Sequence, residues 1–324
     1  MLDLNRLKAL HAVAVYGSVV AAAEALMVTP SAISQQLAKL ERETGAPLLE
    51  RSGRGVRLTD AAGVLAEHAG RILAMVEQAE ADFEAMRGAV VGRLAMAAFP
   101  TAARGIMPKA LATLKAEHPN LELVLYERDP ERQIRDVLRG ELDLVVVQDW
   151  ENQPLPIPEG LSRAPILEDI ADVALPASHP LADRDEVHLN ELCEEKWISN
   201  APGQMCYDWL VFTLRSAELE PEITCYAEEY ATQLALVAAG HGCAIVPRLG
   251  RVWVPEGVRM VPIRPRPVRR IIALWRTEAA RRPAIRAAVA AIRAAAETVD
   301  AVPPDLAVRT PAAAGAGKPG TSGS

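Results

Sequence analysis

Uncharged polar side chains recur along one segment, VTPSAISQQLAKLE at residues 28–41. Ser31, Ser34 and Gln35 offer hydroxyl and amide groups, which both donate and accept hydrogen bonds. If the segment is a helix, its apolar residues form one buried stripe away from these groups: Ile33, Leu37 and Leu40. Hydroxyls can contact several bases in a DNA major groove, and glutamine can pair bidentately with adenine. The alternative is an ordinary solvated helix face.

The surrounding sequence predicts three short helices that would position this face. Apolar residues recur at helical spacing from Leu4 to Val13, and Gly17 ends that pattern. Ser18 can cap a second, short helix. Thr29 is the predicted N-cap of the third helix, with Pro30 at its first position, where proline's missing N–H costs no hydrogen bond. Gly45 is predicted to close the third helix.

A small arginine-bearing hairpin is expected next. The stretch LLERSGRGVRLT at residues 48–59 predicts two short strands around a Ser-Gly-Arg-Gly turn. Arg51 would meet phosphate and Arg54 would enter the adjacent minor groove. A hairpin that merely adds surface charge is the alternative. Directly after a helix-turn-helix, the wing of a DNA-binding module is favoured.

The run GSVVAAAEALMVTPSAISQQLAKLERETGAPLLERSGRGVRLTDAAG, residues 17–63, closely resembles the winged helix-turn-helix of LysR-type transcriptional regulators. The resemblance implies double-stranded DNA as a partner and self-association into a homodimer or homotetramer, with RNA polymerase considered as a further partner. The residues expected at DNA are Thr29, Pro30, Ser31, Ser34, Gln35, Arg51 and Arg54. Many members carry Gln at the position of Pro30 and Arg at that of Gln35, so the bases that are read are not predicted.

Charge, cysteine content and hydropathy restrict which functions other than DNA binding fit the sequence. The chain has a net charge of −7, but residues 1–60 hold seven basic and six acidic residues, a net +1, which leaves −8 elsewhere. The four cysteines form no Cys-x-x-Cys pair, which disfavours structural zinc. We expect no metal or cofactor. No apolar run approaches the roughly 18 residues of a spanning helix, so a cytoplasmic protein without membrane contact is expected.

A long helix is predicted to follow the wing, from about residue 60 to 87. Leu65, Ile72, Ala79 and Met86 repeat every seven residues. A second series is interleaved with the first: Ala69, Val76 and Phe83. Such an a/d seam implies a partner helix, which the family resemblance identifies as that of a second subunit. Packing against the chain's own second domain is the alternative. Gly88 and Gly92 are expected to form a hinge.

From residue 93 strands and helices alternate, which predicts an α/β domain with a parallel sheet covered on both faces. The stretch LSRAPILEDIADVALP, residues 161–176, is expected to supply two strands that cross into a second lobe. The resemblance implies the two-lobed fold of periplasmic binding proteins. The predicted domains are a winged helix-turn-helix at 1–59, a linker at 60–91, an effector-binding domain at 92–300 (lobe I 92–165 and 266–300, lobe II 166–265) and a disordered tail at 301–324.

A small-molecule site is predicted where strands end at helix N-termini, because their unpaired N–H groups point into the cleft of such folds. The candidates are Pro100, Thr101, Ala102, Gln148, Asp149, Ser199, Asn200, Gln204, Glu228 and Tyr230. Thr101 and Ser199 rank first, because a hydroxyl beside a helix N-terminus suits a carboxylate, although each could simply cap its own helix. Members of the family often bind small organic acids between the two lobes.

The sequence also bears on three other functions. Nucleophile, phosphate-loop and zinc-ligand motifs are absent, and the six histidines are dispersed, so an enzyme is not expected. An exported solute-binding protein does not fit the winged head. Thiol-based redox sensing within the same family remains the alternative, because Cys206 lies near the predicted start of a helix, which lowers a thiol's pKa, and near where peroxide-sensing relatives place their reactive thiol.

Overall fold

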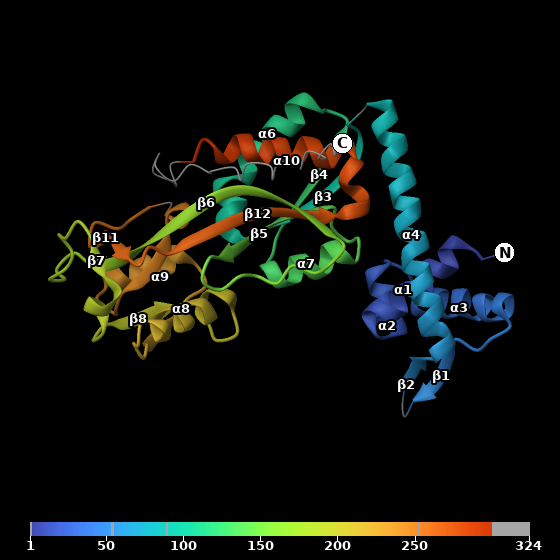
Figure 1. Cartoon of the computed structure of the whole chain (residues 1–324), viewed down its shortest axis with the longest axis horizontal. Coiled ribbons are helices and arrows are strands. Elements are labelled where there is room, and N and C mark those ends of the chain that lie inside the picture. Colours follow the sequence, from blue (N-terminus) through green and yellow to red (C-terminus); the bar gives the residue numbers. More distant parts are fainter. Residues whose placement is uncertain (1, 53–54, 89, 252, 300–324) are drawn as a thin grey trace, which may run out of the picture. The chain divides into compact units, whose positions relative to one another are not determined.

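The computed structural model describes residues 2–52, 55–88, 90–251 and 253–299. The chain forms two compact units, and Figure 1 labels its helices and strands. Unit 1 comprises Met1–Val147, Pro156–Ala164 and Ala273–Ala294, and unit 2 comprises Gln148–Leu155, Pro165–Ile272 and Ala295–Ser324. Two predictions lie outside the described residues: the role of Arg54 and the tail at 301–324.

The head of unit 1 contains the three predicted helices, α1 (Leu4–Tyr16), α2 (Val19–Ala25) and α3 (Pro30–Thr44). The predicted caps are confirmed. The Ser18 and Thr29 hydroxyls accept hydrogen bonds from the Ala21 and Ala32 amides at 3.1 and 3.2 Å. Gly17 and Gly45 end α1 and α3 in the left-handed conformation that glycine adopts without strain.

The head is held together by the apolar sides of these helices. Its fully buried residues include Leu7, Leu10, Leu37 and Leu40. Buried Ala22 and Ala23 add little bulk, so α2 can approach its neighbours closely. The wing follows as β1 (Leu49–Ser52) and β2 (Gly55–Leu58), paired antiparallel with Leu49 opposite Leu58.

The long helix α4 (Asp60–Arg87) starts where Thr59 accepts a hydrogen bond from the Ala62 amide at 3.2 Å. Ala69, a residue of the predicted seam, is buried in the head core, so the chain itself is its packing partner. Two later seam residues face outward: Phe83 is 66% and Met86 is 85% exposed. Pairing of this outer half with a second subunit remains a prediction.

Ion pairs hold α4 against the rest of unit 1. Arg276 places Nε and Nη2 at 2.9 and 2.6 Å from the Glu77 carboxylate. Its Nη1 donates to the carbonyls of Val137 and Leu142. Because one planar guanidinium serves three partners, substitution by lysine would not preserve the set.

The α/β part of unit 1 is built on β3 (Gly92–Ala98), which lies parallel to β4 (Leu121–Glu127) and β5 (Leu144–Trp150). The predicted parallel sheet is therefore confirmed here. Its helices are α5 (Pro100–Gly105), α6 (Met107–Glu117), α7 (Pro130–Leu138) and α10 (Pro283–Ala296). The sequence predicts a turn and then a helix over residues 100–119, whereas the structure forms two helices divided at Ile106.

The stretch at residues 161–176 is one strand, β6 (Leu161–Pro176), so the prediction of two strands is wrong. Its acidic Glu168-Asp169 pair does not end the strand, because Asp169 finds partners inside the protein: it accepts from the Leu249 amide at 3.2 Å and from Arg269 at 2.5 Å. Strand order in the sheet is β4-β3-β5-β12-β6-β11-β7, with β10 also paired to β6; here β7 is Val187–His188, β10 is Ala244–Pro247, β11 is Val258–Arg264 and β12 is Val268–Arg276.

Unit 2 holds the remaining elements. The strands are β7 (Val187–His188), β8 (Lys196–Ser199), β9 (Glu222–Tyr226), β10 (Ala244–Pro247) and β11 (Val258–Arg264); β12 (Val268–Arg276) continues into unit 1. The helices are α8 (Met205–Ser216) and α9 (Tyr230–Ala238), with short 3-10 turns at Leu189–Leu192 and Arg248–Gly250; a third such turn, Thr277–Arg281, belongs to unit 1. Here β10 and β11 run antiparallel to β6, so this lobe is mixed rather than parallel.

Among the described residues, no single helix has the length and apolar character needed to cross a membrane. Taken together, α1 and α2 meet that test by length and composition, with a bend of 114° between them.

Candidate functional site

The polar face of α3 is open to solvent. Ser31, Ser34 and Gln35 are exposed, while Ile33 and Leu37 of the opposite face are buried. The Ser34 hydroxyl donates to the Pro30 carbonyl at 2.9 Å, which leaves its lone pairs to accept a hydrogen bond. The helix thus presents two hydroxyls and one carboxamide outward on a well-packed base.

The wing is fastened to the end of α3 by a carboxylate. Glu41 Oε1 accepts hydrogen bonds from the amides of Leu48 and Leu49 at 2.8 and 3.2 Å. In the hairpin itself, Arg57 is paired with Glu50 at 2.5 Å, so much of its charge is compensated. Arg51 lies in β1 opposite Val56, and its side chain lies outside the described part of the structure.

Several predicted effector residues of unit 2 come together. Gln204, the residue before α8, donates from Nε2 to Glu228 Oε1 at 2.9 Å. Asn200 contacts the Glu228 carbonyl at 3.4 Å. Ser199, the last residue of β8, is only 4% exposed. The residues after β8, before α8 and after β9 therefore form one polar cluster, as the strand-end rule predicted.

Other candidates lie elsewhere. Pro100, Thr101 and Ala102 form the first turn of α5 in unit 1, where Thr101 and Ala102 are buried. Gln148 and Asp149 were expected after a strand, but β5 continues to Trp150, so both are strand residues. The strand is longer than predicted because its polar side chains are satisfied by cations: Gln148 by Arg269 and Asp149 by Arg270.

A small cavity, here named the Cys206 pocket, adjoins the polar cluster. Its volume of about 10 Å³ is close to that needed for a single water molecule. Its lining residues come from β8, α8, α9 and β10: Ile198, Ser199, Asn200, Cys206, Trp209, Leu210, Tyr230, Gln233 and Ile245. The Cys206 thiol lies 3.4 Å from Gln148 Nε2, which donates to it, and 3.7 Å from the Tyr230 hydroxyl.

Glycines shape the surroundings of this pocket. Gly242 has φ +144°, and a Cβ there would lie 2.4 Å from the Lys196 carbonyl oxygen. The close approach allows Cys243 to donate its amide to that carbonyl at 2.8 Å and so fix β8. Gly250 similarly leaves room for the Tyr230 ring.

Burial controls two titrating groups here. Removal from water raises the pKa of Tyr230 well above its usual value, with the nearby Cys206 thiol adding to the shift. Burial likewise raises the pKa of the Cys243 thiol. Tyr230 therefore keeps its proton and can donate a hydrogen bond toward Cys206 or a ligand.

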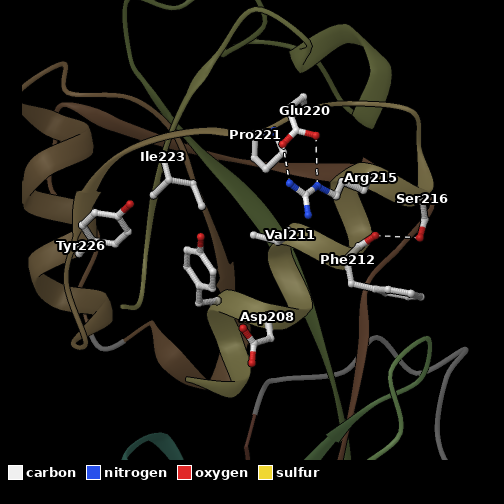
Figure 2. A pocket seen from close by; sticks show the side chains of 10 residues that line it. Asp208, Val211, Phe212, Arg215, Ser216, Glu220, Pro221, Ile223 and Tyr226 are labelled. Carbon is white, nitrogen blue, oxygen red and sulfur yellow. Dashed lines mark hydrogen bonds and ion pairs between the residues drawn. The ribbon is translucent and has the colours of Figure 1, made fainter. Parts of the chain in front are cut away.

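A larger, open hollow of about 750 Å³ lies beside α8 and β9 (Figure 2). Tyr226 and Phe212 line it and are about half exposed. At its rim Arg215 forms a two-point ion pair with Glu220, at 3.1 and 2.6 Å, so this cation is already engaged. No predicted site residue lines this hollow. Within the described residues, no group of three or more His, Cys, Asp or Glu side chains could hold a metal ion.

Two family models match the chain. A bacterial regulatory helix-turn-helix protein model of the lysR family matches residues 4–63, and the LysR substrate binding domain matches residues 87–297. The second match alone spans more than half of the sequence. The chain belongs to the LysR family of transcriptional regulators. As a LysR-family member it is a DNA-binding regulator with an effector-binding domain, and its fold is a helix-turn-helix head with a two-lobed α/β substrate-binding domain.

Individual LysR-family proteins agree with this assignment. The uncharacterized HTH-type transcriptional regulator YnfL of Escherichia coli K12 is 32% identical over 247 residues, which cover 75% of this chain and 81% of YnfL. The crystal structure of full-length CbnR with its target DNA is 26% identical, with a TM-score of 0.51, over 91% of this chain and all of CbnR. A full-length OxyR variant from Pseudomonas aeruginosa has a TM-score of 0.63 over 90% of this chain and 95% of OxyR, but at 22% identity it supports the fold alone.

Sequence reasoning missed three buried polar residues of the regulatory domain. Gln233, 2% exposed, donates to the Ala227 carbonyl at 2.8 Å and holds the loop after β9. Asp169 and Arg269 form a buried ion pair. The available signal was a charge inside an apolar strand, as in ILEDIADVAL and RRIIALW, which requires a buried partner.

Proposed function

We propose that each subunit of this LysR-family regulator reads one half of an interrupted palindromic DNA site, as part of a homodimer or homotetramer. α3 would enter the major groove, with Ser31, Ser34 and Gln35 at base edges and Thr29 and Pro30 near the backbone. The wing would follow, with Arg51 on phosphate and Arg54 in the minor groove. The observation that carries this proposal is the exposed polar face of α3 opposite its buried aliphatic stripe.

The full-length chain and a Ser31→Ala/Ser34→Ala/Gln35→Ala variant test this proposal. Genomic fragments retained by the wild-type protein would be titrated against fragments of scrambled sequence, at matched salt, by fluorescence anisotropy. We expect the variant to lose most of its preference for the retained fragments while binding scrambled DNA as before, because phosphate contacts are kept. An unchanged preference would show that α3 does not read bases.

We further propose that a small-molecule effector binds the regulatory domain at the Cys206 pocket and the Asn200–Gln204–Glu228 cluster of unit 2. Pro100, Thr101 and Ala102 of unit 1 stay predicted effector residues. Support comes from polar side chains gathered at a helix start, where N–H groups favour an anion. Because the Gln204–Glu228 bond bridges the cluster, a ligand larger than water would displace it.

A thermal-shift screen of the full-length protein against small organic acids tests the effector proposal. Binding raises the unfolding midpoint with ligand concentration, by mass action. Any acid that does so should lose its effect in Asn200→Ala, whereas Ser216→Ala, on the far end of α8, should respond as wild type. Equal responses in both variants would place the ligand elsewhere.

A second candidate function, redox control through Cys206, is favoured by the position of its thiol. The sulfur lies in a cavity of one-water size between a carboxamide donor and a phenol. A hydroperoxide, ROOH, would transfer one oxygen to the sulfur, giving a sulfenic acid (Cys–SOH) and releasing ROH. The sulfur is oxidised and the peroxide O–O bond is reduced, so the step needs no other reactant.

Hydrogen peroxide added to the full-length protein distinguishes this alternative. If it holds, Cys206 gains one oxygen by mass spectrometry and DNA binding changes in step, and Cys206→Ser abolishes both. Oxidation of Cys193, which is exposed, serves as the internal reference for an unselective thiol. DNA binding that ignores peroxide, or that responds equally in Cys206→Ser, would rule it out.

A further inference from the structure

Three neighbouring strands of the sheet each contribute one buried polar residue to a single hydrogen-bonded set. In the order β5-β12-β6, these are Gln148, Arg269 and Asp169. Arg269 Nη1 donates to Gln148 Oε1 at 2.6 Å, and Nη2 donates to Asp169 Oδ2 at 2.5 Å. We name this set the Gln148–Arg269–Asp169 row. It is closed to solvent, since all three side chains are buried and the ion pair is at most 1% exposed.

The row meets the Cys206 pocket at one end. The two polar ends of the Gln148 carboxamide are both engaged: Oε1 accepts from Arg269 and Nε2 donates to Cys206 Sγ at 3.4 Å. Cys206 in turn contacts the Tyr230 hydroxyl. A change at the thiol therefore acts on a carboxamide that cannot rotate without also breaking its bond to the buried guanidinium.

The other end of the row is equally constrained. Asp169 accepts from the Leu249 amide as well as from Arg269. β5, β12 and β6 are also the strands by which the chain passes between unit 1 and unit 2, at residues 147–148, 272–273 and 164–165. Loss of a hydrogen-bond partner from a buried guanidinium is energetically costly. Arg269 must therefore move or change partners when Gln148 is displaced.

We propose that Gln148 is the positioning residue through which occupancy of the Cys206 pocket reaches the crossing strands, by way of Arg269. The inference rests on the proposed effector site, because it takes the pocket as the place where a ligand acts. Gln148 contacts Cys206, which lines the pocket. Its role is therefore to transmit ligand binding to the strands rather than to read the DNA sequence.

A second link from α8 to the segment after β5 supplies a matched control. Asn152 accepts from Trp209 Nε1 at 2.8 Å and donates to the Thr213 hydroxyl at 3.0 Å. It joins the same helix to the same chain segment without a hydrogen bond to the row, although its partner Trp209 is stacked on Trp150, whose ring centroid lies 5.8 Å from the Arg269 guanidinium. If any hydrogen bond between α8 and the segment after β5 could transmit the change, Asn152→Ala would reduce the effect on β12 as much as a substitution at Gln148.

The test fills the pocket chemically in the full-length protein carrying Cys193→Ser and Cys225→Ser, which leaves Cys206 and the buried Cys243. Methyl methanethiosulfonate converts the Cys206 thiol to a methyl disulfide and releases methanesulfinic acid. Amide exchange is then followed in α8 and in the β12 peptide. We expect exchange to rise in both, by about fivefold in β12, the equivalent of one lost hydrogen bond.

Two variants decide whether Gln148 carries the effect. Gln148→Glu keeps an acceptor for Arg269 but has no N–H to donate to the thiol. The β12 amides should therefore keep the protection from exchange that they have in unmodified protein, but their exchange should no longer rise when Cys206 is modified. Gln148→Met should lose both. In each variant α8 should still respond, and Asn152→Ala should leave the β12 response intact.

The proposal is overturned if β12 responds in Gln148→Glu as in wild type, if Asn152→Ala removes the response, or if β12 in the wild type ignores a fully modified Cys206. The experiment uses neither DNA nor natural effector. Failure of the proposed regulator function would instead appear in the DNA and thermal-shift titrations, so the two failures are distinguishable.

Discussion

The DNA-binding head and the surroundings of the Cys206 pocket are built in opposite ways. In the head, the side chains proposed to contact bases lie within a few residues of each other on the exposed face of one helix, and local caps place them. Around the pocket, Gln148, Asp169 and Arg269 are brought together across 121 and 100 residues of sequence, and all are buried. The head exposes its polar side chains to solvent, where a partner can bind them, whereas the side chains of the row are buried and contact other residues of the protein.

This contrast predicts where single substitutions destabilise the fold. Arg269→Met leaves the Asp169 carboxylate buried without its cation, so we expect a loss of about 3–5 kcal/mol in the free energy of unfolding. Urea denaturation followed by Trp fluorescence measures it. Arg281→Met is the control: Arg281 and its partner Asp82 are 69% and 42% exposed, and the loss of this pair should cost about 1 kcal/mol or less. Equal losses would contradict the distinction between buried and exposed pairs.

A smaller effect is expected from the glycine that supports β8. In Gly242→Ala the new methyl group would collide with the Lys196 carbonyl, so the unfolding free energy should fall by about 2 kcal/mol. Gly203→Ala also places alanine at a positive φ, here +83°, but with open space around it, and should cost only about 1 kcal/mol. If Gly203→Ala proved the more harmful, backbone strain rather than the close approach would explain both.

The wing offers a test of local placement in the head. Glu41→Ala removes the acceptor shared by the Leu48 and Leu49 amides, and we expect a stability loss of about 1 kcal/mol together with weaker binding to all DNA sequences. Glu43→Ala, on the same helix, is the control, since Glu43 pairs with Arg6 and not with the wing. Calorimetry and anisotropy titrations would measure the two effects. The expectation fails if Glu43→Ala weakens DNA binding as much.

The smallest effect concerns the exposed pair of the hairpin. Glu50→Ala should change stability by less than about 0.5 kcal/mol, because both partners are solvated. It releases Arg57 from its counter-charge, so DNA affinity should rise slightly and depend more steeply on salt. A flat salt response would indicate that Arg57 does not approach phosphate.

Much of the head could be predicted from the sequence because each of its signals is local. Thr29, Pro30 and Gly45 mark the ends of α3, and the aliphatic spacing marks its buried side. The residues of the Asn200–Gln204–Glu228 cluster could also be predicted, because each follows a predicted strand or precedes a predicted helix, which can be seen in the sequence without a three-dimensional structure. The row was not, because nothing near Gln148 in the sequence shows that Arg269 will face it. The prediction of two strands at 161–176 is wrong for the same reason, because the residues that bind Asp169 lie far from it in the sequence.

The central claim is that α3 reads bases while the wing arginine holds the backbone. Selection from randomised duplexes, with wild type, Gln35→Ala and Arg51→Ala compared at several salt concentrations, tests it most directly. We predict that Gln35→Ala loses preference at one base pair of each half-site, by roughly 5- to 150-fold, and keeps the rest. Arg51→Ala should weaken every sequence alike and reduce the salt slope by about one. Identical profiles for the two variants would contradict the account.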